Sequence, residues 1–321
     1  MLSVRVSAPT PLADDLRSRL AADPTVSDVT VLPGASLGGS GDVLLFDMAR
    51  ENANTIMRML RHAGVPEHGS IAVYDPVTVV SDAADAAERA APGHPADGVL
   101  WAQLADSSRE DARPSVSFFV FLLLATLIAG IGRLLDQPIL IIGAMVVGPE
   151  FAPIAATCYA LVRRRLGIAG AALATLLVGF AGSALVSWGV WAAAYGAGLI
   201  TYRQATTGRQ TEFIVSPDGW SFVIAALAGV AGVLSITSSK PSALVGVFIS
   251  ITTVPAVGTI GLTLAVGAWV EAGGAAVQLL VNLAGLLVAG IVTLAVQLQF
   301  GRLLARRLPS RRTVARQRRR T

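Results

Sequence analysis

The residue best suited to do chemistry in this chain is Glu150, which lies in a proline-broken apolar segment, Gly143-Ala-Met-Val-Val-Gly-Pro-Glu-Phe-Ala-Pro153. This segment is the middle of an apolar stretch over residues 138–162. A carboxylate near the centre of a bilayer costs several kcal/mol, and prolines there leave backbone carbonyls without helical donors. Both features are tolerated only where protein or water surrounds them. Glu150 therefore predicts a polar site inside a membrane-spanning region.

The sequence places no opposite charge beside Glu150. Arg163 follows thirteen residues later, which is about 20 Å along a helix, and Arg133 is expected near the outer face. We therefore expect Glu150 either to be protonated, because it is desolvated, or to face water. Intramembrane carboxylates are functional by default, which makes Glu150 a candidate proton- or cation-coupling group. The alternative is a neutral carboxyl that bonds a neighbouring carbonyl.

A second apolar stretch, residues 242–267, is also interrupted by small and polar residues, namely Gly246, Thr252, Thr253, Pro255, Gly258 and Gly261. Broken spans at matching positions of two halves indicate a midplane site for substrate or ion in transporters. Close helix packing is the other use of Gly and Pro in membrane helices, and it stays open. Asn282 is a further polar candidate, with a hydrogen bond between helices as its alternative role. The predicted site consists of Gly148, Pro149, Glu150, Pro153, Thr252, Thr253, Pro255 and Asn282.

Two groups of positive charge are candidates for anion or lipid contacts. Lys240 follows a helix end rich in Ser and Thr, a pattern that fits either an anion site or a solvated turn. Arg163, Arg164 and Arg165 follow the first broken stretch and are expected at anionic lipid headgroups.

Residues for catalysis and metal binding are scarce. Cys158 is the single cysteine, and His62, His68 and His94 all precede the apolar part of the chain. Neither a Cys-based metal site nor a nucleophile–base pair is visible. We therefore predict that the protein is not an enzyme and binds no metal or cofactor.

The composition requires a membrane protein. Hydrophobic residues make up 53% of the 321 residues, charged residues only 14%, and the mean hydropathy is +0.63. These values lie far from the soluble average. The net charge of +4 divides into an acidic N-terminal third and a basic remainder. Because the basic residues lie at predicted helix ends and in the C-terminal tail, nucleic-acid binding is not predicted.

The elements that carry these residues are about six membrane spans, expected over residues 116–135, 138–162, 167–195, 219–238, 242–267 and 274–300. With the N-terminus in the cytoplasm, the triple arginine, Lys240 and the arginine-rich tail all lie inside. Six spans therefore satisfy the positive-inside rule with both termini cytoplasmic, in contact with membrane lipids.

A unit of three spans starts on one side of the membrane and ends on the other, so two consecutive three-span units must be inverted relative to each other. The middle span of each unit is the broken one. We therefore predict an α-helical polytopic membrane protein built from two inverted repeats. Glycines in the third and sixth spans would allow close approach between subunits, which predicts a homo-oligomer, most simply a C2 dimer.

Residues 1–75 predict a cytoplasmic α+β domain, because alternating strands and two helices follow in the order βαββαβ of a ferredoxin-like fold. The glycine-rich residues 33–42 lack the lysine and helix of a phosphate loop, so we interpret them as a hairpin connection. Residues 76–114 are expected to be a linker with a short helix at 82–90, residues 115–300 the transmembrane domain and residues 301–321 a basic cytoplasmic tail. The first residues have no apolar core, so no signal peptide is expected.

Two segments resemble a known family. Ile141-Ile-Gly-Ala-Met-Val-Val-Gly-Pro-Glu-Phe-Ala-Pro-Ile154 is similar to the GAM…P…PI signature of DUF389, a family of hydrophobic bacterial and archaeal proteins. Residues 242–258 and 282–290 resemble its second half, although this chain has Val254-Pro255 where many members have a Pro-Pro pair. The resemblance implies a multi-pass protein of a prokaryotic cytoplasmic membrane and brings no established activity.

These features support three hypotheses of different kinds. The first is a transporter or channel for a small solute or ion, with its site at the two broken spans. The second is a membrane-anchored sensor that binds a cytosolic small molecule or nucleotide through residues 1–75. The third is a scaffold without a ligand. A water-accessible pocket that reaches Glu150 would favour the first hypothesis, and a pocket within residues 1–75 the second.

Overall fold

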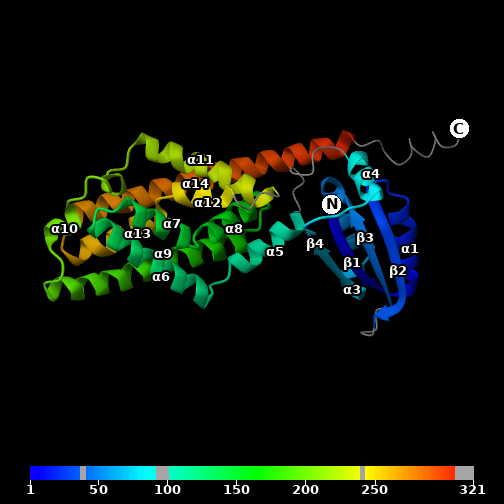
Figure 1. Cartoon of the computed structure of the whole chain (residues 1–321), viewed down its shortest axis with the longest axis horizontal. Helices are drawn as coiled ribbons and strands as arrows, with labels where there is room; N and C mark the ends of the chain where they lie inside the picture. The colour runs from blue at the N-terminus through cyan, green and yellow to red at the C-terminus, as the bar shows by residue number, and fades with distance from the viewer. Residues whose placement is uncertain (37–40, 92–100, 239–242, 308–321) are drawn as a thin grey trace. The chain divides into compact units, whose positions relative to one another are not determined.

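The computed structural model describes residues 1–36, 41–91, 101–238 and 243–307. The chain divides into two compact units, the first built mainly from Met1–Gln103 and the second from Leu104–Ile236 and Lys240–Phe300. Figure 1 shows the first unit as a sheet with helices and the second as a bundle of helices.

The first unit has the expected βαββαβ succession. Its elements are β1 (Leu2–Ala8), α1 (Thr10–Ala21), β2 (Val26–Ser36), β3 (Gly41–Met48), η1 (Arg50–Asn52), α2 (Ala53–His62), α3 (Val65–His68), β4 (Ser70–Tyr74) and α4 (Asp82–Ala90). The strands form one sheet in the order β2-β3-β1-β4, and every neighbouring pair is antiparallel. The strands β2 and β3 run further than the sequence predicted, which shortens the expected glycine-rich connection.

Strand alternation builds the core of this unit. Every second residue of β1, from Leu2 to Ala8, is buried. The buried side chains pack with the apolar faces of α1 and α2, among them Leu16, Leu20 and Leu60. The helix α2 ends just before Gly64, which adopts a left-handed conformation with φ of 80° that favours glycine.

The segment expected to be a linker contains two helices. The helix α4 packs against β2 and β3, and the hydroxyl of Ser81 caps it by accepting from the backbone N–H of Ala84. Its Glu88 also pairs with the N-terminal amine of Met1 at 2.6 Å. A further helix that the sequence analysis missed, α5 (Trp101–Asp111), follows it.

The second unit consists of helices. They are α6 (Val116–Leu134), α7 (Pro138–Val147), α8 (Phe151–Val162), α9 (Leu166–Gly196), α10 (Tyr202–Thr206), η3 (Glu212–Ile214), α11 (Gly219–Thr237), α12 (Ala243–Ser250), α13 (Thr253–Ala265) and α14 (Trp269–Arg307). Four of them, namely α6, α9, α11 and α14, are long and apolar enough to cross a membrane. The pair α7–α8 bends by 53° and would make a fifth span, so the described residues contain four or five candidate spans by length and composition.

Both expected breaks are present. The first lies between α7 and α8, where Pro149 has no backbone N–H to continue the helix. The second lies at Ile251 and Thr252, between α12 and α13. Figure 1 shows these four short helices among the long ones.

Glycines let the short helices approach the long ones closely. In α13, a Cβ on Gly258 would lie 2.5 Å from the backbone oxygen of Thr126 in α6. The helix α8 packs against the other half, where a Cβ on Gly232 of α11 would lie 2.3 Å from the ring of Phe151. Thus α13 contacts a long helix of the earlier part of the chain, and α8 contacts a long helix of the later part.

Candidate functional site at the helix breaks

Glu150 lies directly before α8, and its side chain is only 4% exposed. The hydroxyl of Thr253, the first residue of α13, donates to Glu150 Oε1 at 2.8 Å. Thr253 is itself fully buried. The N-terminal ends of α8 and α13 therefore meet at this carboxyl, although the two residues are 103 positions apart in the chain.

The other carboxyl oxygen, Oε2, points back toward Gly148. A Cβ on Gly148 would lie 2.3 Å from Oε2 and 2.8 Å from Cγ2 of Val254. Glycine at this position therefore leaves the space that the carboxyl occupies. Oε2 is buried and has no hydrogen-bond partner among the described residues.

Thr252 connects the second break to α14. Its hydroxyl accepts a hydrogen bond from Gln278 Nε2 at 3.2 Å and another from Asn282 Nδ2. Gln278 and Asn282 are four residues apart, so both project from the same face of α14, and each is only 3% exposed. Gln278 Oε1, like Glu150 Oε2, is buried without a partner among the described residues.

The two breaks share a local pattern. Pro153 is the third residue of α8, and Pro255 is the third residue of α13. Since proline has no N–H, neither donates to the carbonyl four residues earlier. The carbonyl of Pro149 therefore receives no hydrogen bond from position 153, and the carbonyl of Ile251 receives none from position 255. Both carbonyls lie at the breaks.

The structure brings together most of the site residues predicted from the sequence. Six of the eight are residues of the breaks or contact them directly, namely Gly148, Pro149, Glu150, Thr252, Thr253 and Asn282. The prolines 153 and 255 shape the ends of α8 and α13. Gln278 was missed, although its position one turn before Asn282 in an apolar helix is a usable signal.

The predicted anion and lipid contacts lie elsewhere. Arg163, Arg164 and Arg165 form the turn between α8 and α9, at the opposite end of α8 from Glu150. Arg163 and Arg164 are exposed there. Lys240 lies outside the described residues.

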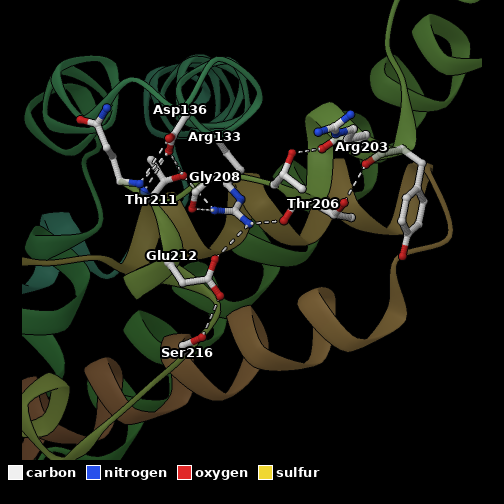
Figure 2. A network of polar contacts seen from close by, with 11 residues as sticks. Arg133, Asp136, Arg203, Thr206, Gly208, Thr211, Glu212 and Ser216 are labelled. Atoms are coloured by element: carbon white, nitrogen blue, oxygen red, sulfur yellow. Dashed lines mark hydrogen bonds and ion pairs between the residues drawn. The ribbon is translucent and has the colours of Figure 1, made fainter.

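A second polar network, which the sequence did not predict, surrounds Arg133 at the end of α6 (Figure 2). This side chain is only 1% exposed. Its Nη1 donates to the Gly208 carbonyl at 3.2 Å and to Thr211 Oγ1 at 2.8 Å. Its Nη2 donates to the Thr206 carbonyl at 3.2 Å and lies 4.0 Å from a Glu212 carboxyl oxygen.

Asp136 completes this network from the turn after α6. Its Oδ1 accepts from the backbone N–H of Gln210 at 3.1 Å and from both the N–H and the hydroxyl of Thr211 at 3.0 Å. Burial alone would raise the pKa of Asp136, but these hydrogen bonds and the charge of Arg133 together hold it below the ordinary value of 3.8. The segment over residues 201–218, which we call the connecting loop, is thereby fastened to the α6–α7 turn.

A hollow of about 430 Å³ opens on the surface of the helical unit, and Glu150 is not among its lining residues. It is lined by Ala181, Ala184, Leu185, Trp188, Leu264 and Trp269.

No cluster of three or more metal-ligating His, Cys, Asp or Glu side chains occurs among the described residues. Residues 145–288 match the model of a family described as "Domain of unknown function (DUF389)". The match includes both breaks and the polar residues of α14, and it stops short of Arg133 and of the first unit. Comparison with curated proteins and with solved structures gives no match.

Proposed function

This chain belongs through residues 145–288 to the DUF389 family, a family of unknown function, and we propose that it is a transporter or channel for a small solute or ion. Its site lies where the α7–α8 and α12–α13 breaks meet. Membrane insertion is supported by the long apolar helices of the second unit. Transport is proposed in place of catalysis because the polar side chains at the breaks form no nucleophile–base pair.

One observation carries this proposal. A carboxyl group buried to 4% exposure is held between two interrupted helices that come from distant parts of the chain. Polar groups at such depth are expensive and are retained chiefly where they serve a pathway or a bound ligand. The hydrogen bonds of Thr252 with Gln278 and Asn282 extend this group of buried polar side chains to α14.

We further propose six spans, with α7–α8 and α12–α13 each crossing as one broken span and with both termini in the cytoplasm of a prokaryotic cell. Equal spacing of the long helices supports two inverted three-span repeats. The residues that begin α6 and α11 are Val116 and Gly219, and those that begin α9 and α14 are Leu166 and Trp269. Both pairs are the same number of residues apart.

For the first unit we propose a ferredoxin-like fold that regulates the membrane part. The sheet order β2-β3-β1-β4, with α1 between β1 and β2 and the longer helix α2 between β3 and β4, supports this assignment. Its sheet also presents exposed apolar side chains, among them Leu32, Leu45 and Tyr74. Binding of a cytosolic small molecule by this unit is the alternative to transport as the main function.

A C2 dimer remains our proposal for the assembly. Gly285 and Gly290 are used within the chain, because a Cβ there would meet Ala225 or Cys158. Gly167, Gly170 and Gly182 of α9 instead have open space around them, as an interface between subunits would require. Native mass spectrometry in mild detergent that finds only monomers would contradict the dimer.

The test of transport compares the full chain with Glu150→Gln in proteoliposomes. Small molecules that co-purify with the protein, identified by mass spectrometry, are supplied as labelled solutes, and a pH-sensitive dye in the lumen reports proton movement. We expect flux above that of empty liposomes for the natural protein and its loss in Glu150→Gln, because the substitution keeps shape and removes the charge. Glu271→Gln, at the start of α14, is the matched control and should keep the flux. Equal flux in the natural protein and Glu150→Gln would remove Glu150 from the mechanism.

A further inference from the structure

Two oxygen atoms at the helix breaks lack hydrogen-bond donors. Glu150 Oε2 and Gln278 Oε1 are both buried and have no partner among the described residues. They are linked through adjacent residues, because Thr253 donates to Glu150 while Thr252 accepts from Gln278. A buried acceptor without a donor costs about 1–3 kcal/mol, and more when it is charged. Two of them on side chains that bond to adjacent residues of one break point to a bound group that satisfies oxygen acceptors.

The chemistry around these atoms is that of oxygen ligands. The cluster offers the carboxylate of Glu150, the amide oxygen of Gln278 and the hydroxyl oxygen of Thr253, whereas the Thr252 hydroxyl already accepts two hydrogen bonds. The carbonyl oxygens of Pro149 and Ile251 are further candidate ligands, because Pro153 and Pro255 have no N–H to donate to them. Carboxylates, amides and carbonyls are the ligands of hard cations, and interrupted membrane helices commonly coordinate Na⁺ or H⁺ in this way.

The charge at this place selects the kind of cation. Among the described residues Glu150 has no ion-pair partner, and its contacts with Thr253 and Gly148 are with uncharged groups. Because burial disfavours an uncompensated carboxylate, Glu150 can keep its charge here only beside a counterion. A monovalent cation would neutralise that single charge, whereas a divalent cation would leave an uncompensated positive charge in an apolar interior.

We propose that the helix breaks form a binding site for one dehydrated monovalent cation, with Glu150 Oε2 and Gln278 Oε1 among its ligands. This inference rests on the proposed function only for the role of the ion, which would be the transported or coupling species. Binding itself requires only the geometry of the breaks. A proton on Glu150, in place of a cation, is the competing occupant.

The direct test is equilibrium binding of radioactive Na⁺ to the full chain in detergent, with choline chloride keeping the ionic strength constant. We expect saturable binding of one Na⁺ per chain in the natural protein. Glu150→Gln should weaken it by at least about tenfold, because it removes the only charged ligand. Gln278→Leu should weaken it less, since one neutral ligand is lost, and Glu271→Gln should leave it unchanged.

A stability measurement shows that the variants are folded. Na⁺ should raise the melting temperature of the natural protein, because a ligand of the folded state stabilises it by mass action, and the increase should disappear in Glu150→Gln. The proposal is overturned if folded natural protein binds no Na⁺, Li⁺ or K⁺, or if Glu150→Gln binds Na⁺ as tightly as the natural protein.

The same preparations separate this inference from the proposed function. Na⁺ binding that depends on Glu150, in proteoliposomes without any flux, would keep the cation site and remove transport. Flux that depends on Glu150 and is unchanged when choline replaces Na⁺, Li⁺ and K⁺ would keep transport and remove the cation site.

Discussion

At the scale of single residues, the site depends on Gly148 as much as on Glu150. The carboxyl group of Glu150 occupies the space that a side chain at position 148 would need, since a Cβ there would lie 2.3 Å from Oε2. Glycine is therefore required here for close approach, not for an unusual backbone conformation, because φ is −65°.

We expect Gly148→Ala to displace the carboxyl and to destabilise the protein by about 1 kcal/mol, the lower end of the usual cost of overpacking, because the crowded atoms are ends of side chains that can shift. Gly143→Ala is the matched control, because Gly143 lies in α7, which ends just before Gly148, and has open space around it. Thermal unfolding in detergent should separate the two variants, with Gly143→Ala near the natural protein. Identical melting temperatures would show that the carboxyl does not lie over Gly148.

Asp136 gives a pH dependence whose sign follows from its environment. Its pKa in the folded protein lies below the ordinary 3.8. Asp136 therefore contributes fully to the stability of the folded protein above pH 3.8, and this contribution is lost as the pH falls through the lower pKa of the folded protein. We expect Asp136→Asn to speed amide hydrogen exchange at Gln210 and Thr211 at neutral pH. This difference from the natural protein should shrink at pH values below about 3.8. A difference that persists undiminished in acid would contradict the assigned hydrogen bonds.

At the scale of elements, the short helices are held by close packing against long helices. The helix α13 packs against α6 and α9. Its Gly258 approaches the backbone of α6, and its Gly261 approaches Ser187 of α9. Because backbone atoms cannot move aside as a flexible side chain can, this contact should tolerate no larger residue at position 258.

Gly258→Ala tests this packing. We expect a loss of about 1–3 kcal/mol in stability, because the new methyl group would lie 2.5 Å from the Thr126 carbonyl. Gly246→Ala in α12 has open space and serves as the control. Thermal unfolding of both variants in the same detergent checks the expectation. If Gly258→Ala leaves the stability unchanged while Gly246→Ala lowers it, then α12, and not α13, is the helix packed closely against its neighbours.

At the scale of the whole molecule, six spans with cytoplasmic termini remain our prediction. The connecting loop should then lie outside and the α8–α9 turn inside. We expect a membrane-impermeant thiol reagent to label Arg209→Cys in intact cells and Arg163→Cys only after the membrane is opened, both in a Cys158→Ala background. Arg209 and Arg163 suit labelling because both are exposed. The neighbouring Gly208 does not, because a side chain there would meet the hydroxyl of Thr211. The opposite labelling pattern would overturn the topology.

Local chemistry explains what the sequence determined by itself. Long apolar runs predict the long helices, and Pro149 and Pro255 predict the breaks, because each lacks the N–H that would bond the carbonyl four residues earlier. Strand alternation in β1 likewise predicts a sheet with one buried face. The segment around Glu150 predicted a polar group within an apolar stretch and carries one of the motifs that resemble the family.

Tertiary structure alone decided which groups meet. The hydrogen bond from Thr253 to Glu150 joins residues 103 positions apart, and the one from Arg133 to Thr211 joins residues 78 apart. No local pattern encodes such pairs, because they depend on how α6, α8 and α13 pack. The sequence therefore predicted a polar site at the breaks, whereas the partner of Glu150, the contact of Gln278 with Thr252 and the burial of Arg133 required the packed bundle.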